Sequence, residues 1–266
     1  MLCNRLIACI IVADGNVVQS KQFKHTNIVG NAQTATDFFT MWAVDEMVVV
    51  DVSRTMDNRN RFLKAVDELS RHVFIPLTVG GWVKSVDDAR QLLNLGADKI
   101  VINTEAYRKP QLIRDMADKF GSQCVVVSID SSKGKTYVDR GRGATGVSTQ
   151  GWASTAQKYG AGEIFLTSID HDGMLDGYDL DLVASVSQAV TIPVVASGGV
   201  GAWEHLVKGI EAGADAVSAA NIFHYSEQST KKAKEYMLKA GLNVRPIDFF
   251  HNEEARNVDY GSYTRK

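Results

Sequence analysis

Carboxylates that could transfer protons stand at the ends of apolar runs in the sequence. Asp130, Asp51 and Asp170 each follow such a run, and an acid at the end of a buried strand is costly unless it is solvated, paired or used. We predict a proton-transfer role for Asp130, because it should point toward the same site as two glycine loops. Asp51 could act in catalysis or brace a loop, and Asp170 could accept loop N–H groups. His171 is typical of a solvated loop residue, and Asp172-Gly173 of a turn.

Two glycine pairs follow apolar runs and could bind phosphate. Gly80-Gly81 stands after one run and Gly198-Gly199 after another. Glycines let main-chain N–H groups approach an anion without interference from a Cβ atom. A lone pair usually marks a tight turn, but its duplication at equivalent positions favours phosphate binding. Trp82 stands after the first pair, where a third small residue would be expected.

Eight short apolar runs, rich in β-branched residues, punctuate the chain. They cover residues 6–12, 47–52, 75–79, 99–103, 124–129, 163–169, 192–196 and 216–219. Their lack of strict alternation is expected of strands covered on both faces. Helical patterns lie between them, for example at 86–95, 111–120, 202–212 and 230–240, and these four are each followed by glycine. The pattern predicts an α/β fold, a single-domain (βα)8 TIM barrel over residues 1–245, with a doubly wound open sheet as the alternative.

The chain repeats itself at half its length. Three pairs of segments match at an offset of about 118 residues: 96–98 with 213–215, 78–81 with 196–199, and 9–12 with 128–131. Such a repeat indicates that the barrel is built from two half-barrel repeats. Equivalent strand ends should then lie across the barrel axis from each other, which places Ile11 opposite Asp130.

Composition and charge exclude several classes of function. Of 266 residues, 45% are hydrophobic and 23% charged, and the net charge is −2. This composition suits a globular core, and the charge offers no positive field for nucleic acid or an anionic membrane. The three cysteines have no metal-ligand or disulfide spacing, which favours a reducing compartment and therefore a cytoplasmic protein. We predict neither a metal nor a cofactor.

The two ends of the chain invite separate interpretations. An apolar stretch before Cys9 resembles a leader sequence, but it is short and runs directly into Asp14-Gly15, which favours a first strand. No apolar run reaches the length of a membrane span. Residues 246–266 form a C-terminal extension. Phe249 and Phe250 could pin its start, and its polar end is typical of a surface strap or a frayed terminus.

Many of these motifs together resemble the cyclase subunit of imidazole glycerol phosphate synthase. The matching segments are 5–15, 45–51, 78–81, 96–104, 125–130, 162–173, 177–179, 196–199 and 213–224, and the likeness spans about residues 1–245. In that family a glutaminase subunit docks on the N-terminal face of the barrel. Its ammonia passes through the barrel to a substrate with two phosphates. The resemblance therefore implies a heterodimer, a phosphorylated small-molecule substrate, and formation of imidazole glycerol phosphate and an aminoimidazole carboxamide ribotide.

The resemblance also assigns residues to the site, with four departures. Two aspartates handle protons in the family, and they fall on Asp130 and on Ile11, which has no proton to transfer. The implied phosphate-binding residues are Gly81, Asn103, Thr104, Gly173, Gly198, Gly199 and Asn221. Gln19 replaces a family lysine, Trp82 the third glycine of the first phosphate loop, and Asn221 a serine. Whether cyclisation survives these changes is open at this point.

The other end of the barrel matches the family closely. Its ammonia inlet is a ring of two basic and two acidic side chains, which fall on Arg5, Glu46, Lys99 and Glu163. Asp98 matches an acid at the glutaminase contact. The plainer alternative is that charged residues at strand starts cap the base of the barrel.

Three functions are therefore compatible with the sequence. The first is a divergent cyclase-type subunit that receives ammonia from a glutaminase and serves amidation in surface-polysaccharide biosynthesis. The second is the authentic cyclase of histidine biosynthesis, with Asp51 or Asp14 replacing the missing acid. The third is a non-catalytic scaffold that activates the glutaminase.

Overall fold

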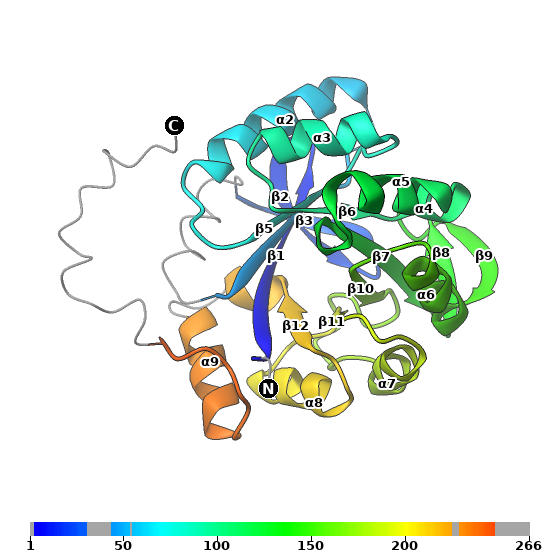
Figure 1. The fold of residues 1–266 in the computed structure, drawn as a ribbon. Coiled ribbons are helices and arrows are strands. Elements are labelled where there is room, and N and C mark those ends of the chain that lie inside the picture. The colour runs from blue at the N-terminus through cyan, green and yellow to red at the C-terminus, as the bar shows by residue number, and fades with distance from the viewer. Residues whose placement is uncertain (1–2, 31–43, 54, 225–228, 248–266) are drawn as a thin grey trace.

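A closed barrel of eight parallel strands forms the centre of the protein (Figure 1). The computed structural model describes residues 3–30, 44–53, 55–224 and 229–247. The barrel strands are β1 (Arg5–Ala13), β4 (Glu46–Asp51), β5 (Leu77–Gly80), β6 (Lys99–Ile102), β7 (Val125–Ser132), β10 (Glu163–Ser168), β11 (Val194–Ser197) and β12 (Ala216–Ala219). Strand β7 pairs with β10, which closes the ring. The predicted (βα)8 barrel is confirmed, and each of the eight predicted runs contributes a strand.

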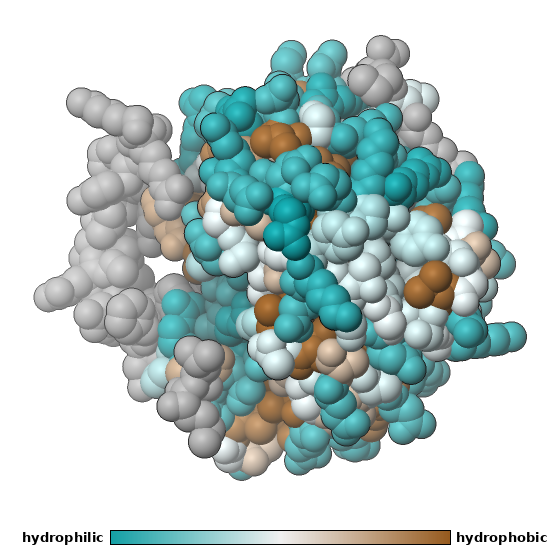
Figure 2. Space-filling model, turned by 45° about the vertical axis from the view of Figure 1, so that its right-hand side comes forward, coloured by the Kyte–Doolittle hydropathy of each residue, from teal (hydrophilic) through white to brown (hydrophobic). Residues whose placement is uncertain are grey.

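Helices surround the barrel on its outer side (Figure 1). They are α2 (Met56–Ser70), α3 (Val86–Asn94), α4 (Thr104–Arg108), α5 (Gln111–Phe120), α6 (Thr149–Lys158), α7 (Leu180–Ala189), α8 (Trp203–Glu211) and α9 (Ser229–Lys239), with 3-10 turns η1 (Ser122–Cys124) and η2 (Asn221–His224). Helix α5 shows the common pattern: Leu112, Ile113 and Met116 are buried against the barrel. On the face drawn in Figure 2, hydrophilic residues predominate and hydrophobic ones form small separate groups.

Side chains of alternate strand residues form two separate cores. One packs between strands and helices and includes Met47, Val49 and Ile129. The other fills the barrel interior and includes Cys9, Val48, Val101, Val126, Phe165 and Val195, with Ile11 and Val50 packed against it. Because successive strand residues face opposite sides, this division fixes which strand-end residues point into the barrel.

Two hairpins that the sequence analysis did not predict extend the barrel. β2 (Asn16–Lys21) and β3 (Lys24–Gly30) follow β1, and β8 (Lys135–Val138) and β9 (Gly143–Ser148) follow β7. Their turns meet above the C-terminal ends of the strands: a Cβ atom built on Gly141 would lie 2.9 Å from the ring of Phe23 and 3.2 Å from Ile169. β1 and β7 are the first strands of the two predicted halves, so each half carries its hairpin at the same place.

The same hydrogen-bonded clasp recurs at the base of the barrel. The backbone N–H of Asp98 donates to the carbonyl of Leu77 at 2.8 Å, and the Asp98 carboxylate accepts from the N–H of Leu77 at 2.8 Å. Asp215 forms the same pair of bonds with Val194, both at 2.9 Å. The repeated Gly-Ala-Asp segments therefore tie the start of one strand to the start of the next.

A third clasp joins the C-terminal part of the chain to the base. Asp45 bonds Leu6 in the same reciprocal way, and its carboxylate also pairs with the fully buried Lys234 at 2.5 Å and with Arg245 at 3.0 Å. Asn4 bridges to Val244. Asn243 and Val244 thus lie against Asn4, the residue before β1. The rest of the C-terminal extension, including Phe249 and Phe250, lies outside the described residues.

Replacement of Asp215 should test the clasp. Asp215→Ala leaves the Val194 N–H without its side-chain acceptor and should lower the free energy of unfolding by about 1–3 kcal/mol. Asp215→Asn keeps an acceptor oxygen and should lower it by much less. Urea denaturation of the two variants measures the difference, and equal losses would count against the clasp.

Candidate active site

Asp130 lies in the barrel interior at the C-terminal mouth. It has the inward parity of Val126 on β7, it is 7% exposed, and its carboxylate accepts a hydrogen bond from Asn103 Nδ2 at 2.9 Å. Burial raises its pKa to about 7; hydrogen bonds from Asn103 and Ser128 oppose this, and the negative charge of Asp172 adds to it. A carboxyl with a pKa near neutrality is suited to general acid–base chemistry.

Two hydroxyl residues that the sequence analysis did not predict, Thr167 and Ser197, extend the polar side of the mouth from Asp130. Thr167 of β10 is in register with Asp130 on one side and with Ser197 of β11 on the other. All three have the inward parity of their strands, so they form a continuous polar row along one side of the mouth. Ser197 directly precedes the predicted Gly198-Gly199 pair, and strand parity is the signal that could have identified Thr167.

The opposite side of the mouth carries hydrocarbon. Ile11 shares the inward parity of Ile7 and Cys9 on β1 and packs against the interior core. β1 and β7 are separated by three strands in either direction around the ring, so Ile11 and Asp130 lie on strands opposite each other. The mouth is thus polar along β7, β10 and β11 and apolar at β1.

Asp51 braces a loop and does not replace the missing acid. Its neighbours Met47 and Val49 on β4 belong to the outer core, so Asp51 points away from the barrel interior. Its carboxylate accepts from Ser53 N at 2.8 Å, from Ser53 Oγ at 2.5 Å and from Trp82 Nε1 at 2.6 Å. Of the two roles expected for Asp51, the structure supports bracing.

Trp82 is fixed by the same carboxylate. Its φ of 64° is a left-handed conformation that favours glycine. The backbone at this position therefore has a conformation typical of glycine, although the residue carries an indole side chain. The preceding Gly81 lies directly on Asp51: an added Cβ would stand 2.6 Å from the Asp51 carbonyl oxygen. The indole is therefore turned toward the end of β4. Asp14, the other candidate replacement acid, is exposed and bonded to Asn58.

The predicted phosphate-binding residues fall into two groups at the mouth. Gly81, Asn103 and Thr104 lie after β5 and β6; Gly173, Gly198, Gly199 and Asn221 lie after β10, β11 and β12. β5 and β11 are opposite each other in the ring. The structure brings the predicted residues together in these two groups, and phosphate binding by them stays a prediction.

Each group is tied to neighbouring loops. Thr104 Oγ1 accepts from Asp139 N at 2.9 Å, which joins the first group to the β8–β9 turn. Gly177 N donates to Gly199 O at 2.8 Å, and Asn221 Nδ2 donates to Ser20 O at 3.4 Å. The second group is therefore held by the loop after β10 and by the β2–β3 hairpin.

Asp172, which the sequence analysis assigns to a turn, has a hydrogen-bonded carboxylate at the mouth. Its Oδ2 accepts from Ser20 Oγ at 2.5 Å and from Phe23 N at 3.2 Å. Burial raises its pKa, against the effect of these two bonds. Asp172 also interacts electrostatically with Asp130 and with Cys9. Asp170, in contrast, accepts from Ser132 and Lys133 and braces the β7–β8 connection.

The four charged residues at the base form a closed ring of ion pairs. Arg5 pairs with Glu46 at 2.8 Å and with Glu163 at 2.6 Å, and Lys99 pairs with the same two carboxylates at 3.0 Å each. Burial opposes the charge on Arg5, but Glu163 and Glu46 outweigh it and raise its pKa. Burial likewise opposes the charge on Glu46, yet Arg5 and Lys99 hold its pKa below the usual value. Arg5 and Glu46 therefore both carry their charges at neutral pH.

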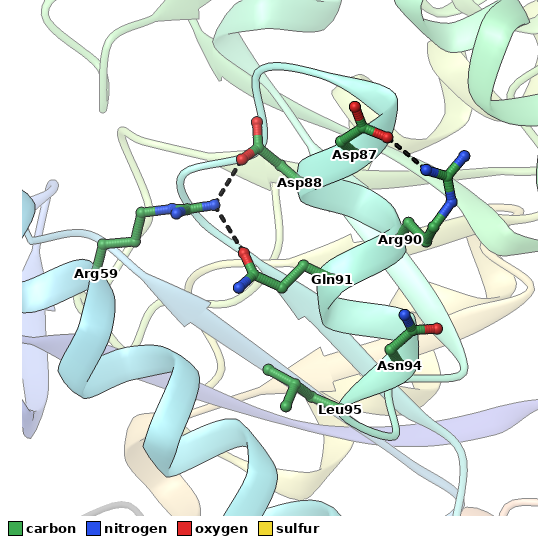
Figure 3. A pocket seen from close by; sticks show the side chains of 7 residues that line it. All are labelled: Arg59, Asp87, Asp88, Arg90, Gln91, Asn94 and Leu95. Carbon is green, nitrogen blue, oxygen red and sulfur yellow. Dashed lines mark hydrogen bonds and ion pairs between the residues drawn. The ribbon is translucent and has the colours of Figure 1, made fainter.

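A depression of about 520 Å³ on the outer surface does not belong to this site (Figure 3). It lies between α2 and α3, and its charged groups are already paired: Arg59 bonds Asp88 at 2.5 Å and Gln91 at 3.0 Å, and Arg90 bonds Asp87. In the described residues we find no cluster of His, Cys, Asp or Glu that could hold a metal ion. The same part of the chain contains no helix long and apolar enough to span a membrane.

Fold and site define a (βα)8-barrel enzyme with an acid and two glycine loops at its mouth. Residues 5–229 match the family model described as histidine biosynthesis protein. The chain belongs to this family, whose members are barrel isomerases and cyclases of the histidine pathway.

The raised pKa of Asp130 predicts a pH-dependent effect of its replacement. A carboxyl with a folded-state pKa of about 7, above its value of 3.8 in the unfolded chain, favours folding below pH 3.8 and progressively loses that contribution up to pH 7. Asp130→Asn should therefore stabilise the protein at pH 8 relative to the wild type, and much less at pH 4. Thermal unfolding at the two pH values measures this, and a pH-independent difference would contradict the buried, protonated state.

Proposed function

We propose that this protein is a cyclase-type subunit that receives ammonia from a glutaminase through its barrel and uses it at the C-terminal mouth. Family membership supports an isomerase- or cyclase-type barrel enzyme. The observation that carries the finer proposal is the closed ring of Arg5, Glu46, Lys99 and Glu163 at the barrel base. If these residues only capped the base of the barrel, their charges would not need to alternate in sign around the barrel axis. They would also not need to form a closed ring of ion pairs.

The barrel interior above the ring suits a neutral molecule. Ile7, Val48, Val101, Val126 and Phe165 line it. Transfer of ammonium into such surroundings is costly, whereas neutral ammonia is small and uncharged. The ring and the apolar interior together would admit ammonia and hold back ions, and the path ends at the polar row beside Asp130.

Three departures at the mouth favour an acceptor other than the imidazole precursor. Ile11 supplies hydrocarbon where the resembled family has an acid, and Trp82 fills a glycine position and binds Asp51. Gln19 replaces a lysine. We assign the protein to amidation in surface-polysaccharide biosynthesis, on a phosphorylated substrate bound by the two glycine loops. On this proposal Asp98 lies at the glutaminase contact, in addition to its clasp with Leu77.

One observation favours a second candidate, the authentic cyclase of histidine biosynthesis. Asp172 brings a carboxylate into electrostatic contact with Asp130, so the mouth has two acids in spite of Ile11. Assays on the imidazole precursor separate the two candidates.

Ile11→Asp is the substitution that distinguishes them. If the mouth has been adapted to another acceptor, the wild type converts the imidazole precursor slowly with free ammonia. Restoring the acid should then raise the rate by about 10²-fold or more, the usual contribution of a general acid or base. Ile11→Asn, of matched size and without the proton, is the control. Rapid conversion by the wild type would instead establish the authentic cyclase.

An isotope competition tests ammonia transfer itself. A variant that converts the precursor is mixed with a glutaminase subunit of imidazole glycerol phosphate synthase, amide-¹⁵N glutamine and unlabelled ammonium. The product should carry mostly ¹⁵N. Lys99→Met removes two of the four ion pairs and should lower the ¹⁵N share on the order of tenfold, in the usual range of coupling between two sites. Lys119→Met, on the exposed face of α5, should leave it unchanged. A product with the isotope ratio of the bulk solution would refute the channel.

A further inference from the structure

A fully buried hydroxyl in the barrel interior has no hydrogen-bond partner among the described residues. It belongs to Ser218 of β12, which is 0% exposed. Ala216 is part of the interior core and Ala220 packs against it, so the Ser218 side chain, two residues from each, also points toward the barrel axis. The Ser218 carbonyl, in contrast, accepts from the Tyr178 hydroxyl at 2.8 Å. A buried hydroxyl is costly when it stays unpaired, so a molecule that pairs with it would be stabilised there.

The side chains around Ser218 restrict what could bind to its hydroxyl. Its registered neighbour on β1 is Ile7, and the interior core also contains Val195 and the Cys9 thiol. Burial raises the pKa of this thiol to about 12, so it stays neutral. An ion would be poorly solvated in such surroundings. The bound molecule must therefore be small, neutral and able to form hydrogen bonds, a description that fits both water and ammonia.

Ser218 belongs to a line of inward-facing residues that runs from the base ring to Asp130. Because barrel strands are tilted, residues that are paired across successive strands shift steadily along the barrel axis. From β4 through β1, β12, β11 and β10 to β7, the line consists of Glu46, Ile7, Ser218, Ser197, Thr167 and Asp130. Glu46 begins β4, whereas Asp130 lies near the end of β7. The line therefore connects the two ends of the barrel.

Three hydroxyl residues are consecutive in this line. Thr167 is paired with Ser197, and the register of β11 with β12, continued by one residue, places Ser197 beside Ser218. Neighbouring strands lie about 4.8 Å apart, so a small molecule that leaves the Ser218 hydroxyl can reach the next one in a single short step. The three hydroxyls thus connect the apolar interior to the polar side of the mouth.

We propose that the Ser218 hydroxyl binds a small neutral hydrogen-bonding molecule inside the barrel, and that in the working complex this molecule is ammonia on its way to Asp130. The hydroxyl donates to the lone pair of ammonia or accepts from one of its N–H groups, and no covalent bond changes. Ser197 and Thr167 bind the molecule next. The inference rests on the proposed function for the identity of the molecule, but occupation of the site can be measured without glutaminase or substrate.

Crystal structures test whether the site is occupied. At a resolution that shows ordered water, the wild type should have a density peak within hydrogen-bond distance of Ser218 Oγ. Ser218→Ala, which removes only the hydroxyl, should lose that peak. Ser187→Ala, which removes a buried hydroxyl on α7 outside the barrel, should keep it. A wild-type interior without density beside Ser218 overturns the site, and so does a peak that persists in Ser218→Ala.

The isotope competition tests whether the bound molecule is ammonia. Ser218→Thr keeps the hydroxyl, and Ser218→Val has the same shape without it. With the glutaminase, amide-¹⁵N glutamine and unlabelled ammonium, in a background that converts the precursor, Ser218→Val should lower the ratio of labelled to unlabelled product about two- to tenfold relative to Ser218→Thr, as expected for the loss of one hydrogen bond. Ser218→Ala, which adds no atoms to the interior, should show the same loss if the larger side chains prevent folding.

The two experiments together separate the possible outcomes. Equal isotope ratios in Ser218→Thr and Ser218→Val, with the density peak present, would identify a water site and overturn the assignment to ammonia. If the background with wild-type Ser218 already gives the isotope ratio of the bulk solution, the proposed function fails, and the assignment to ammonia fails with it. The crystal structures then still decide whether Ser218 binds a neutral molecule.

Discussion

The two-residue period of a closed parallel barrel is the constraint on which this structure depends. Strands covered on both faces place alternate residues in the interior, and closure between β7 and β10 brings eight such faces around one axis. The period puts Val126 and Asp130 inside but turns Asp51 toward the helices. A shift of one residue in β4 would bring Asp51 into the mouth, so the difference between a bracing and a catalytic acid is one of register.

Strand order and the strand-end residues could be predicted from the sequence because they follow from local pattern. Eight apolar runs rich in β-branched residues predict strands near their observed places, and the repeat at about 118 residues predicts that Ile11 lies opposite Asp130. The four residues of the charged ring were predicted from the family resemblance, and each of them begins its strand. The N-terminal ends of all the strands in a parallel barrel lie at the same end, independently of the conformation of the loops.

The remaining parts of the site depend on contacts between distant loops, which carry little local signal. The segment after β1 is mostly polar and was not recognised as a hairpin, yet Ser20 and Phe23 hold Asp172, about 150 residues away, at hydrogen-bond distance. Asp172-Gly173 is typical of a turn in sequence, and the glycine is in fact needed for close approach to Ser20. Similarly, nothing local predicts that Trp82 donates to Asp51.

The two ends of the barrel handle buried charge in opposite ways. At the base, Arg5 and Lys99 hold the pKa of Glu46 below its usual value. At the mouth, burial raises the pKa of Asp130 to about 7. The base therefore keeps fixed charges at neutral pH while the mouth holds protons that can move. On the proposed function, neutral ammonia that crosses the apolar interior would arrive where a proton is available.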